Sequence, residues 1–141
     1  MDDRLDNSEL IRSALFAREN SYCPYSGYAV GAALLCKNGD VYTGCNIENA
    51  AFTPGNCAER TAIFKAVSSG ERSFEKIAIV GGKKGENPDS FAFPCGVCRQ
   101  VMAEFVNPKE FKIIVATSPL DFREYTLGEL LPESFGPENL E

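Results

Sequence analysis

The sequence contains no histidine, and this absence removes several classes of catalytic and metal site at once. Hydrolases of the Ser-His-Asp and Cys-His types need an imidazole to accept the proton of the nucleophile. Zinc sites built on imidazole are excluded in the same way. Any zinc ion in this protein must therefore be bound by sulfur or carboxylate ligands.

Long apolar runs and an excess of positive charge are also missing. No stretch approaches the roughly 20 apolar residues of a membrane-spanning helix, and the first residues do not resemble a signal peptide. We therefore expect a cytoplasmic protein with reduced thiols and no membrane partner. The 14 Lys and Arg against 20 Asp and Glu give a net charge of -6, so we do not expect a nucleic-acid polymer as partner.

Six cysteines are present, and three of them lie in two short motifs that predict a metal site. Cys57 and the pair Cys95 and Cys98 each stand where a helix should begin, and the partial positive charge of a helix N-terminus favours thiolates. Three thiolates fill three positions of a zinc tetrahedron and leave the fourth for water, as in catalytic zinc sites. The Cys-x-x-Cys spacing alone fits a redox dithiol equally well, but the third cysteine favours zinc.

Glu59 follows Cys57 by two residues and should point toward the open position of this zinc site. A carboxylate there can take a proton from zinc-bound water and pass it to a substrate. Because three thiolates make the centre negative, neighbouring donors should form hydrogen bonds to the sulfurs. Arg60 is the strongest candidate donor, and Arg99 or Gln100 could act in the same way, although a surface role for Arg99 fits equally well.

Apolar runs and turn residues predict an α/β protein with helices on both faces of one mixed sheet, and the length suits a single domain, residues 1–141. A polar loop is expected at 81–93. The expected strands are 28–36, 41–46, 77–80 and 113–116, with Asn38-Gly39 as a hairpin turn. The first expected helix is capped by Asn7 or Ser8 and runs to about residue 20. The others are expected at 57–69, from Pro94 to 106, and as a short turn at 127–131 capped by Thr126.

Three motifs together resemble those of the small, all-cysteine cytidine deaminases, and the resemblance extends from Ser21 to Pro132. The motifs are Gly44-Cys45-Asn46-Ile47-Glu48-Asn49-Ala50, Asn56-Cys57-Ala58-Glu59-Arg60-Thr61-Ala62 and Pro94-Cys95-Gly96-Val97-Cys98-Arg99-Gln100. The resemblance implies a three-layer α/β/α sandwich with one mixed five-stranded sheet. It also implies a hydrolase acting on cyclic amidines, which converts free cytidine and deoxycytidine to uridine and deoxyuridine in pyrimidine salvage and releases ammonia.

The resemblance further implies the chemistry of the zinc site. Cys57, Cys95 and Cys98 would bind one Zn²⁺ per subunit, and Glu59 would activate the zinc-bound water that attacks C4 of the base. Backbone groups near Ala58 would contact the edge of the pyrimidine. The family's homotetramers, with active sites at subunit interfaces, are the expected assembly.

The remaining substrate contacts also come from the resemblance. Asn46 and Glu48 would bind the ribose hydroxyls. Phe52, together with Phe135 from a neighbouring subunit, would form aromatic walls of the pocket. Tyr28 stands where the family commonly has Phe, and its additional hydroxyl needs a hydrogen-bond partner, so the family pattern does not fix the fine shape of the base or ribose pocket.

Other interpretations of the cysteine motifs stay open at this point. A deaminase of another cytosine compound, such as the nucleoside antibiotic blasticidin S, would share the zinc site, although Asn46 and Glu48 favour an unmodified ribose. A polynucleotide-editing deaminase should have a basic surface, and this chain is acidic. A structural zinc site needs a fourth ligand, for which no further cysteine lies in a paired motif, and a redox dithiol is the last alternative. The other cysteines, Cys23, Cys36 and Cys45, are expected to be small buried residues.

Overall fold

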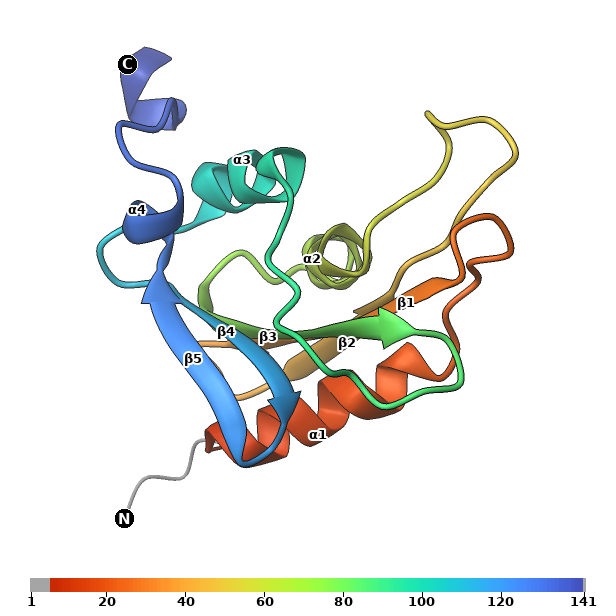
Figure 1. Cartoon of the computed structure of the whole chain (residues 1–141). Coiled ribbons are helices and arrows are strands. Elements are labelled where there is room, and N and C mark those ends of the chain that lie inside the picture. The colour runs from red at the N-terminus through yellow and green to blue at the C-terminus, as the bar shows by residue number, and fades with distance from the viewer. Residues whose placement is uncertain (1–5, 141) are drawn as a thin grey trace.

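A computed structural model describes residues 6–140, and its centre is one mixed sheet of five strands (Figure 1). The sheet has the order β2-β1-β3-β4-β5; β3 and β4 are parallel, and all other neighbours are antiparallel. The strands are β1 (Tyr28–Cys36), β2 (Val41–Cys45), β3 (Phe74–Lys83), β4 (Lys112–Ser118) and β5 (Asp121–Thr126).

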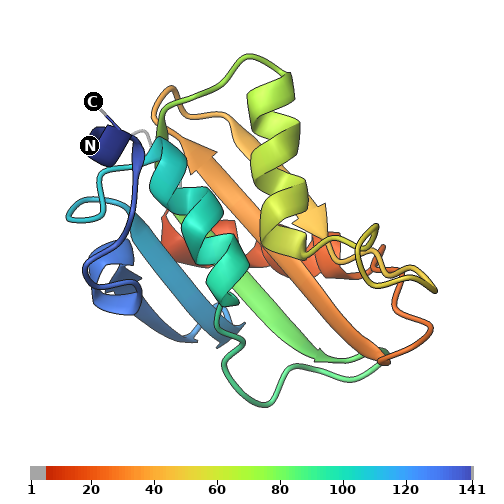
Figure 2. The same ribbon diagram turned by 90° about the horizontal axis from the view of Figure 1, so that it is seen from above.

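Helices cover both faces of this sheet. Helix α1 lies on one face, and α2 and α3 lie beside each other on the opposite face (Figures 1 and 2). The helices are α1 (Asn7–Arg18), α2 (Ala58–Ser68), α3 (Gly96–Phe105), α4 (Leu127–Leu130) and a 3-10 turn η1 (Pro137–Leu140). This three-layer α/β/α arrangement confirms the expected fold class.

The two layers of helix create two apolar cores, one on each side of the sheet. In β1, Ala32 and Leu34 belong to the core under α2 and α3, whereas Ala33 and Leu35 belong to the core under α1. All four side chains are fully buried. Because both sheet faces are covered, the central strands form continuous apolar runs instead of alternating with polar residues.

The distance between β2 and α2 is set by a glycine. A methyl group on Gly44 would lie 2.5 Å from the carbonyl oxygen of Ala58 and 2.6 Å from the amide nitrogen of Ala62. Such distances are shorter than any ordinary contact, so only glycine allows this approach. The first turn of α2, which contains the expected site residues Ala58, Glu59 and Arg60, therefore lies directly against the sheet.

The structure corrects two of the expected helix starts. Asp6, and not Asn7 or Ser8, caps α1, because its carboxylate accepts a hydrogen bond from the backbone of Glu9 at 2.9 Å. The third helix does not begin at Pro94, because the sulfur of Cys95 accepts a hydrogen bond from Cys98 N at 3.5 Å and takes the cap position. In contrast, Thr126 caps α4 as expected.

The expected strand at 77–80 was too short, and one strand of the sheet was missed. Strand β3 continues to Lys83, since Gly81 and Gly82 pair with β1, so the predicted loop at 81–93 begins later than expected. Strand β5 was not recognised from the residue pattern. Its side chains are mostly exposed at the edge of the sheet, and the apolar alternation that signals a strand is therefore absent.

Candidate metal centre and active site

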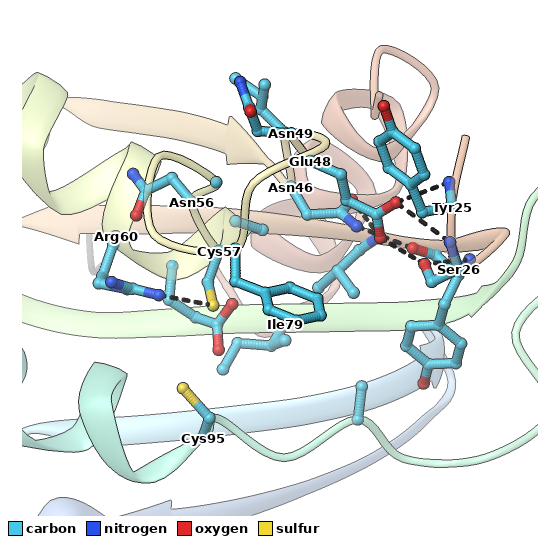
Figure 3. A pocket seen from close by; sticks show the side chains of 18 of the residues that line it. Tyr25, Ser26, Asn46, Glu48, Asn49, Asn56, Cys57, Arg60, Ile79 and Cys95 are labelled. Carbon is cyan, nitrogen blue, oxygen red and sulfur yellow. Dashed lines mark hydrogen bonds between the residues drawn. The ribbon is translucent and has the colours of Figure 1, made fainter. Parts of the chain in front are cut away.

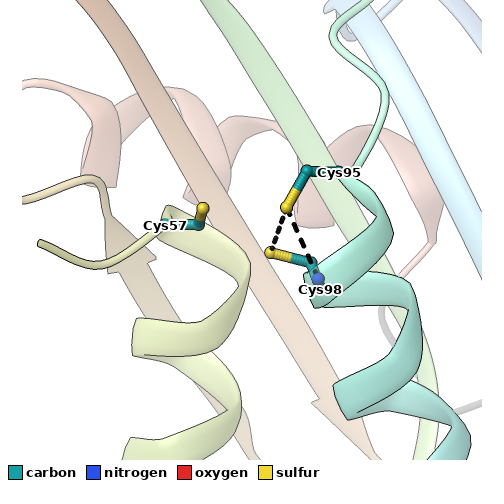
Figure 4. Close-up of side chains that lie close together, drawn as sticks. All are labelled: Cys57, Cys95 and Cys98. Atoms are coloured by element: carbon teal, nitrogen blue, oxygen red, sulfur yellow. Dashed lines mark hydrogen bonds between the residues drawn. The ribbon is translucent and has the colours of Figure 1, made fainter. Parts of the chain in front are cut away.

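Three cysteine sulfurs converge where two helices begin. Cys57 is the N-cap of α2, Cys95 is the N-cap of α3, and Cys98 lies in the first turn of α3. The three sulfur atoms lie within 4.8 Å of one another, and Cys95 Sγ and Cys98 Sγ are 3.5 Å apart (Figure 4). Helices α2 and α3 start side by side on the same face of the sheet, which brings residues almost 40 positions apart together.

This cluster fits the requirements of a zinc site. A tetrahedral Zn²⁺ with Zn–S distances of about 2.3 Å holds its sulfur ligands about 3.8 Å apart, close to the spacing in this cluster. Within residues 6–140, no other His, Cys, Asp or Glu side chain joins the three. The donor set therefore fits a zinc ion that keeps one position for a non-protein ligand.

The electrostatics of the cluster also favour a cation. A hydrogen bond from Cys98 and one from Arg60 lower the pKa of Cys57 to about 5. The hydrogen bond to Cys57 raises the pKa of Cys98, because the proton of Cys98 is held between the two neighbouring sulfurs. A divalent metal ion would displace this proton and compensate the negative charge.

Arg60 makes the contact to sulfur that was expected of it. Its Nη2 donates a hydrogen bond to Cys57 Sγ at 3.1 Å, and its Nε is buried without a partner in the described part of the chain. Gln100 was also expected to donate a hydrogen bond to a sulfur, but its Nε2 donates to the backbone carbonyl of Phe135 at 2.9 Å instead. Arg99 also turns away from the sulfurs and donates to the carbonyls of Pro94 and Leu130 at 2.8 and 2.6 Å.

Glu59 is one of the few buried polar residues, with 5% of its surface exposed, and it lies in the first turn of α2 beside the cysteine cluster. Burial raises the pKa of its carboxyl group to about 7, and the negative charge of Cys57 acts in the same direction. A carboxyl group with a pKa near neutrality can both accept and donate a proton. Glu59 therefore has the properties of a general acid and base.

A pocket of about 950 Å³ opens beside these residues, and this is large enough for a small organic ligand. Figure 3 shows Cys57 and Arg60 on one side of the pocket and Tyr25 and Ser26 on the other. Of the expected substrate contacts, Tyr28, Asn46, Glu48, Phe52 and Ala58 line the pocket, together with Glu59. Phe135 and Gln100 are not among its lining residues.

The comparison with known families agrees with this geometry. Residues 5–115 match the model of the cytidine and deoxycytidylate deaminase zinc-binding region. The chain belongs to this family. The matched range includes the three cysteines of the cluster and Glu59.

Similar proteins cover nearly the whole chain. Cytidine deaminases from Sporosarcina psychrophila and Halalkalibacterium halodurans are each 48% identical over 136 residues, which is 96% of this chain and 96% and 98% of theirs. The crystal structure of cytidine deaminase from Burkholderia pseudomallei has a TM-score of 0.83 and 43% identity, and the match covers 93% of this chain and 100% of that one. These matches confirm that the chain is an enzyme of the cytidine deaminase type.

Two polar residues that this deaminase was expected to use for the sugar are already held by hydrogen bonds. Asn46 donates from Nδ2 to the carbonyl of Tyr28 at 2.8 Å and accepts at Oδ1 from Val30 N at 2.9 Å. Glu48 accepts hydrogen bonds from the segment 25–26, and these lower the pKa of its carboxyl group, with the Ser26 hydroxyl as the largest cause. Ser26 had no expected role, although it belongs to the segment that resembles the family.

The two expected aromatic walls differ in their positions. Phe52 lies at the pocket and its side chain is fully exposed. Phe135 has 57% of its surface exposed, and its backbone carbonyl accepts a hydrogen bond from the side-chain amide of Gln100. Within one subunit, the ring of Phe135 therefore does not contribute to the pocket.

The remaining expectations concern residues outside the site. Cys23 and Cys36 are buried as expected, whereas Cys45 is only half-buried. Burial raises the pKa of Cys36 to about 11, so this thiol is poorly nucleophilic. Among residues 6–140, no helix combines the length and the apolar character that crossing a membrane requires.

Proposed function

We propose that this protein is a zinc-dependent hydrolase that converts free cytidine and deoxycytidine to uridine and deoxyuridine and releases ammonia. The observation that carries the proposal is the position of buried Glu59 beside three converging cysteine sulfurs, at one end of a pocket whose other end contains fixed polar groups. The relatives that cover almost the entire chain are themselves cytidine deaminases, which supports the same activity.

Cys57, Cys95 and Cys98 would hold one zinc ion per subunit, and this ion would supply Lewis-acid activation of a water molecule. Glu59 would accept a proton from the attacking water and deliver it to the ring nitrogen N3 while the oxygen bonds to C4. It would then carry the remaining proton of that oxygen to the amino group, so that the C4–N bond breaks, ammonia leaves and a C4 carbonyl forms. Its carboxyl group suits this shuttle because burial brings its pKa to about 7. Arg60 would keep the thiolate of Cys57 in place through its hydrogen bond at 3.1 Å.

Substrate binding would use the opposite end of the pocket. Asn46 and Glu48 would bind hydroxyl groups of the sugar, because an amide and an ionised carboxylate can each accept a hydrogen bond from them. Backbone groups near Ala58 would contact the pyrimidine, and Tyr28 and Phe52 would contribute aromatic surface. With these contacts, the base would lie near Glu59 and the sugar near Glu48.

A free nucleoside fits this pocket better than a nucleotide. Arg60 is the one cationic side chain among the lining residues that the structure describes, and it contacts Cys57. Lys84 does not line the pocket, and its Nζ donates to the carbonyl and the hydroxyl of Ser21 at 2.7 and 3.2 Å. Without a cation near Glu48, a 5′-phosphate would be repelled.

The assembly and cellular role complete the proposal. We propose one catalytic domain over residues 1–141, a homotetramer, and a cytoplasmic role in pyrimidine salvage. Phe135 would enter the pocket of a neighbouring subunit, which its exposed ring and its absence from the pocket of its own subunit support. Exposed Phe64 and Val97, on α2 and α3, are further apolar side chains that subunit contacts could cover.

The decisive experiment compares Glu59→Gln with Glu104→Gln, a control on the exposed surface of α3. Loss of cytidine absorbance would give the rate, and metal analysis would give zinc content. We expect Glu59→Gln to keep zinc but lose about 10²–10⁴-fold in kcat, whereas the control keeps both. Near-normal turnover by zinc-loaded Glu59→Gln would contradict the assigned role, and comparable use of CMP would contradict the preference for free nucleosides.

A further inference from the structure

Ser26 connects the two residues that are expected to bind the sugar. Its hydroxyl donates a hydrogen bond to Oε2 of Glu48 and accepts one from the backbone N–H of Tyr28 at 3.0 Å. The other oxygen of Glu48, Oε1, accepts from the backbone N–H groups of Tyr25 and Ser26 at 3.0 and 3.1 Å. One short turn therefore holds both oxygens of the Glu48 carboxylate (Figure 3).

Asn46 is attached to the same turn from the other side. Its Nδ2 donates to the carbonyl oxygen of Tyr28 at 2.8 Å. The backbone N–H of Tyr28 is bound to Ser26, so a continuous chain of hydrogen bonds runs from Glu48 through Ser26 and Tyr28 to Asn46. The relative position of the carboxylate and the amide is thereby fixed before any ligand arrives.

The turn itself is anchored to its neighbours. The carbonyl of Gly27 accepts a hydrogen bond from Lys84 N at 2.9 Å, and the amide of Gly27 donates to the carbonyl of Cys23 at 2.9 Å. The backbone N–H of Glu48 donates to the carbonyl of Tyr22 at 2.8 Å. Because the turn is held in place, the hydrogen bond from Ser26 holds the Glu48 carboxylate in one position.

The number of hydrogen bonds that the Glu48 carboxylate accepts shows how many of its lone pairs remain for a ligand. An ionised carboxylate has about four lone-pair directions, and three of them are taken by the turn. The remaining direction belongs to Oε2, the oxygen that also accepts from the Ser26 hydroxyl. A fixed single acceptor selects a donor at one position, which suits one hydroxyl group of a sugar.

We propose that Ser26 is a positioning residue for sugar recognition, which fixes the Glu48 carboxylate so that Oε2 accepts a hydrogen bond from a hydroxyl of the nucleoside sugar. The inference rests on the proposed function. Ser26 lies on the side of the pocket away from Cys57, so its contribution concerns binding of the sugar and not the proton transfers at the base. Loss of its hydroxyl leaves the Glu48 carboxylate held through Oε1 alone, so that Oε2 no longer has a partner that fixes its direction.

The test is a comparison of Ser26→Ala and the unmodified enzyme with two substrates, cytidine and 2′,3′-dideoxycytidine. With cytidine, we expect kcat/KM to fall about tenfold, mainly through KM, because one hydrogen bond to a charged group is lost. With 2′,3′-dideoxycytidine, which lacks the 2′- and 3′-hydroxyls and keeps only the 5′-hydroxyl, the two proteins should have similar kcat/KM. Ser26→Thr, which keeps a hydroxyl, should recover most of the activity with cytidine.

Two further variants make the experiment decisive. Ser13→Ala removes a half-buried hydroxyl of α1 that donates to the carbonyl of Glu9, and it should leave kcat/KM for both substrates unchanged. In a Glu48→Gln background, Ser26→Ala should have little additional effect, because Ser26 acts through Glu48.

The outcomes separate this inference from the proposed function. If the unmodified protein does not turn over cytidine, the proposed function is wrong and the inference falls with it. If it does, an equal loss with both substrates, or additive effects of Ser26→Ala and Glu48→Gln, would overturn the inference alone. A loss confined to cytidine and recovered by Ser26→Thr would support it.

Discussion

Gly44 offers a direct test of how the sheet positions the active site, because it has no catalytic chemistry of its own. It lies in β2, where α2 passes so closely that a methyl group would be 2.5 Å from Ala58 O. The same helix turn contains Glu59 and follows Cys57. We therefore expect Gly44→Ala to impair zinc binding and catalysis together.

The magnitude follows from this distance. Ordinary contacts of a methyl group begin near 3.4 Å, so the start of α2 must move by roughly 1 Å. A displacement of that size at a catalytic group costs on the order of 100-fold in rate. Forcing an additional methyl group into a close-packed region also destabilises a protein by about 1–3 kcal/mol. Gly44→Ala should therefore lose about 100-fold in kcat and a measurable part of its stability.

Gly31 provides the matched control on the opposite face of the sheet. A methyl group there would lie 2.0 Å from Ala14 O and 2.7 Å from Arg18 N, both in α1, which contributes no cysteine to the cluster. Gly31→Ala should be at least as destabilised as Gly44→Ala, but its folded fraction should keep zinc and kcat close to those of the unmodified enzyme.

The assay combines thermal unfolding, zinc titration and cytidine turnover at a temperature where both variants are folded. If Gly44→Ala were destabilised but retained full zinc affinity and kcat, the argument that β2 sets the position of the α2 start would be refuted. Equal loss of zinc affinity in Gly31→Ala would also refute it, because both effects would then reflect general loss of stability.

Three other predictions concern the metal ligands, the arginine beside them and a helix cap. Cys95→Ala should lose zinc and activity and should unfold at a lower temperature, since structural zinc binding contributes on the order of 10 kcal/mol. Cys45→Ala should keep its metal, and an unchanged melting temperature in metal-free Cys95→Ala would count against this prediction. Arg60→Ala should lose about 10–100-fold in zinc affinity or kcat/KM, with partial recovery in Arg60→Lys, and full activity in Arg60→Ala would show that its contact with Cys57 is dispensable. Thr126→Ala removes the cap of α4 and should lower the melting temperature by a few degrees without changing kcat; a large loss of kcat would mean that α4 affects the active site.

The metal ligands could be predicted from the sequence because their signals are local and chemical. Cys57 and the pair Cys95 and Cys98 each stand at a helix start, and the absence of histidine leaves sulfur and carboxylate as the available zinc ligands. Glu59 was found by its spacing from Cys57, and Arg60 by its position next to Glu59. These relations lie within single elements, where sequence spacing determines which side chains are neighbours.

Tertiary structure decided the contacts between segments distant in the chain. Gln100 was expected at the sulfurs, but the C-terminal segment brings the carbonyl of Phe135 within its reach. Strand β5 was not predicted because an exposed edge strand needs no apolar alternation, and its pairing with β4 places it in the sheet.

The support of Glu48 by Ser26 joins residues 22 positions apart. It depends on the turn after α1 lying beside the segment that follows β2. No sequence spacing encodes that contact, because it exists only when Ser26 and Glu48 are brought together by the folded chain.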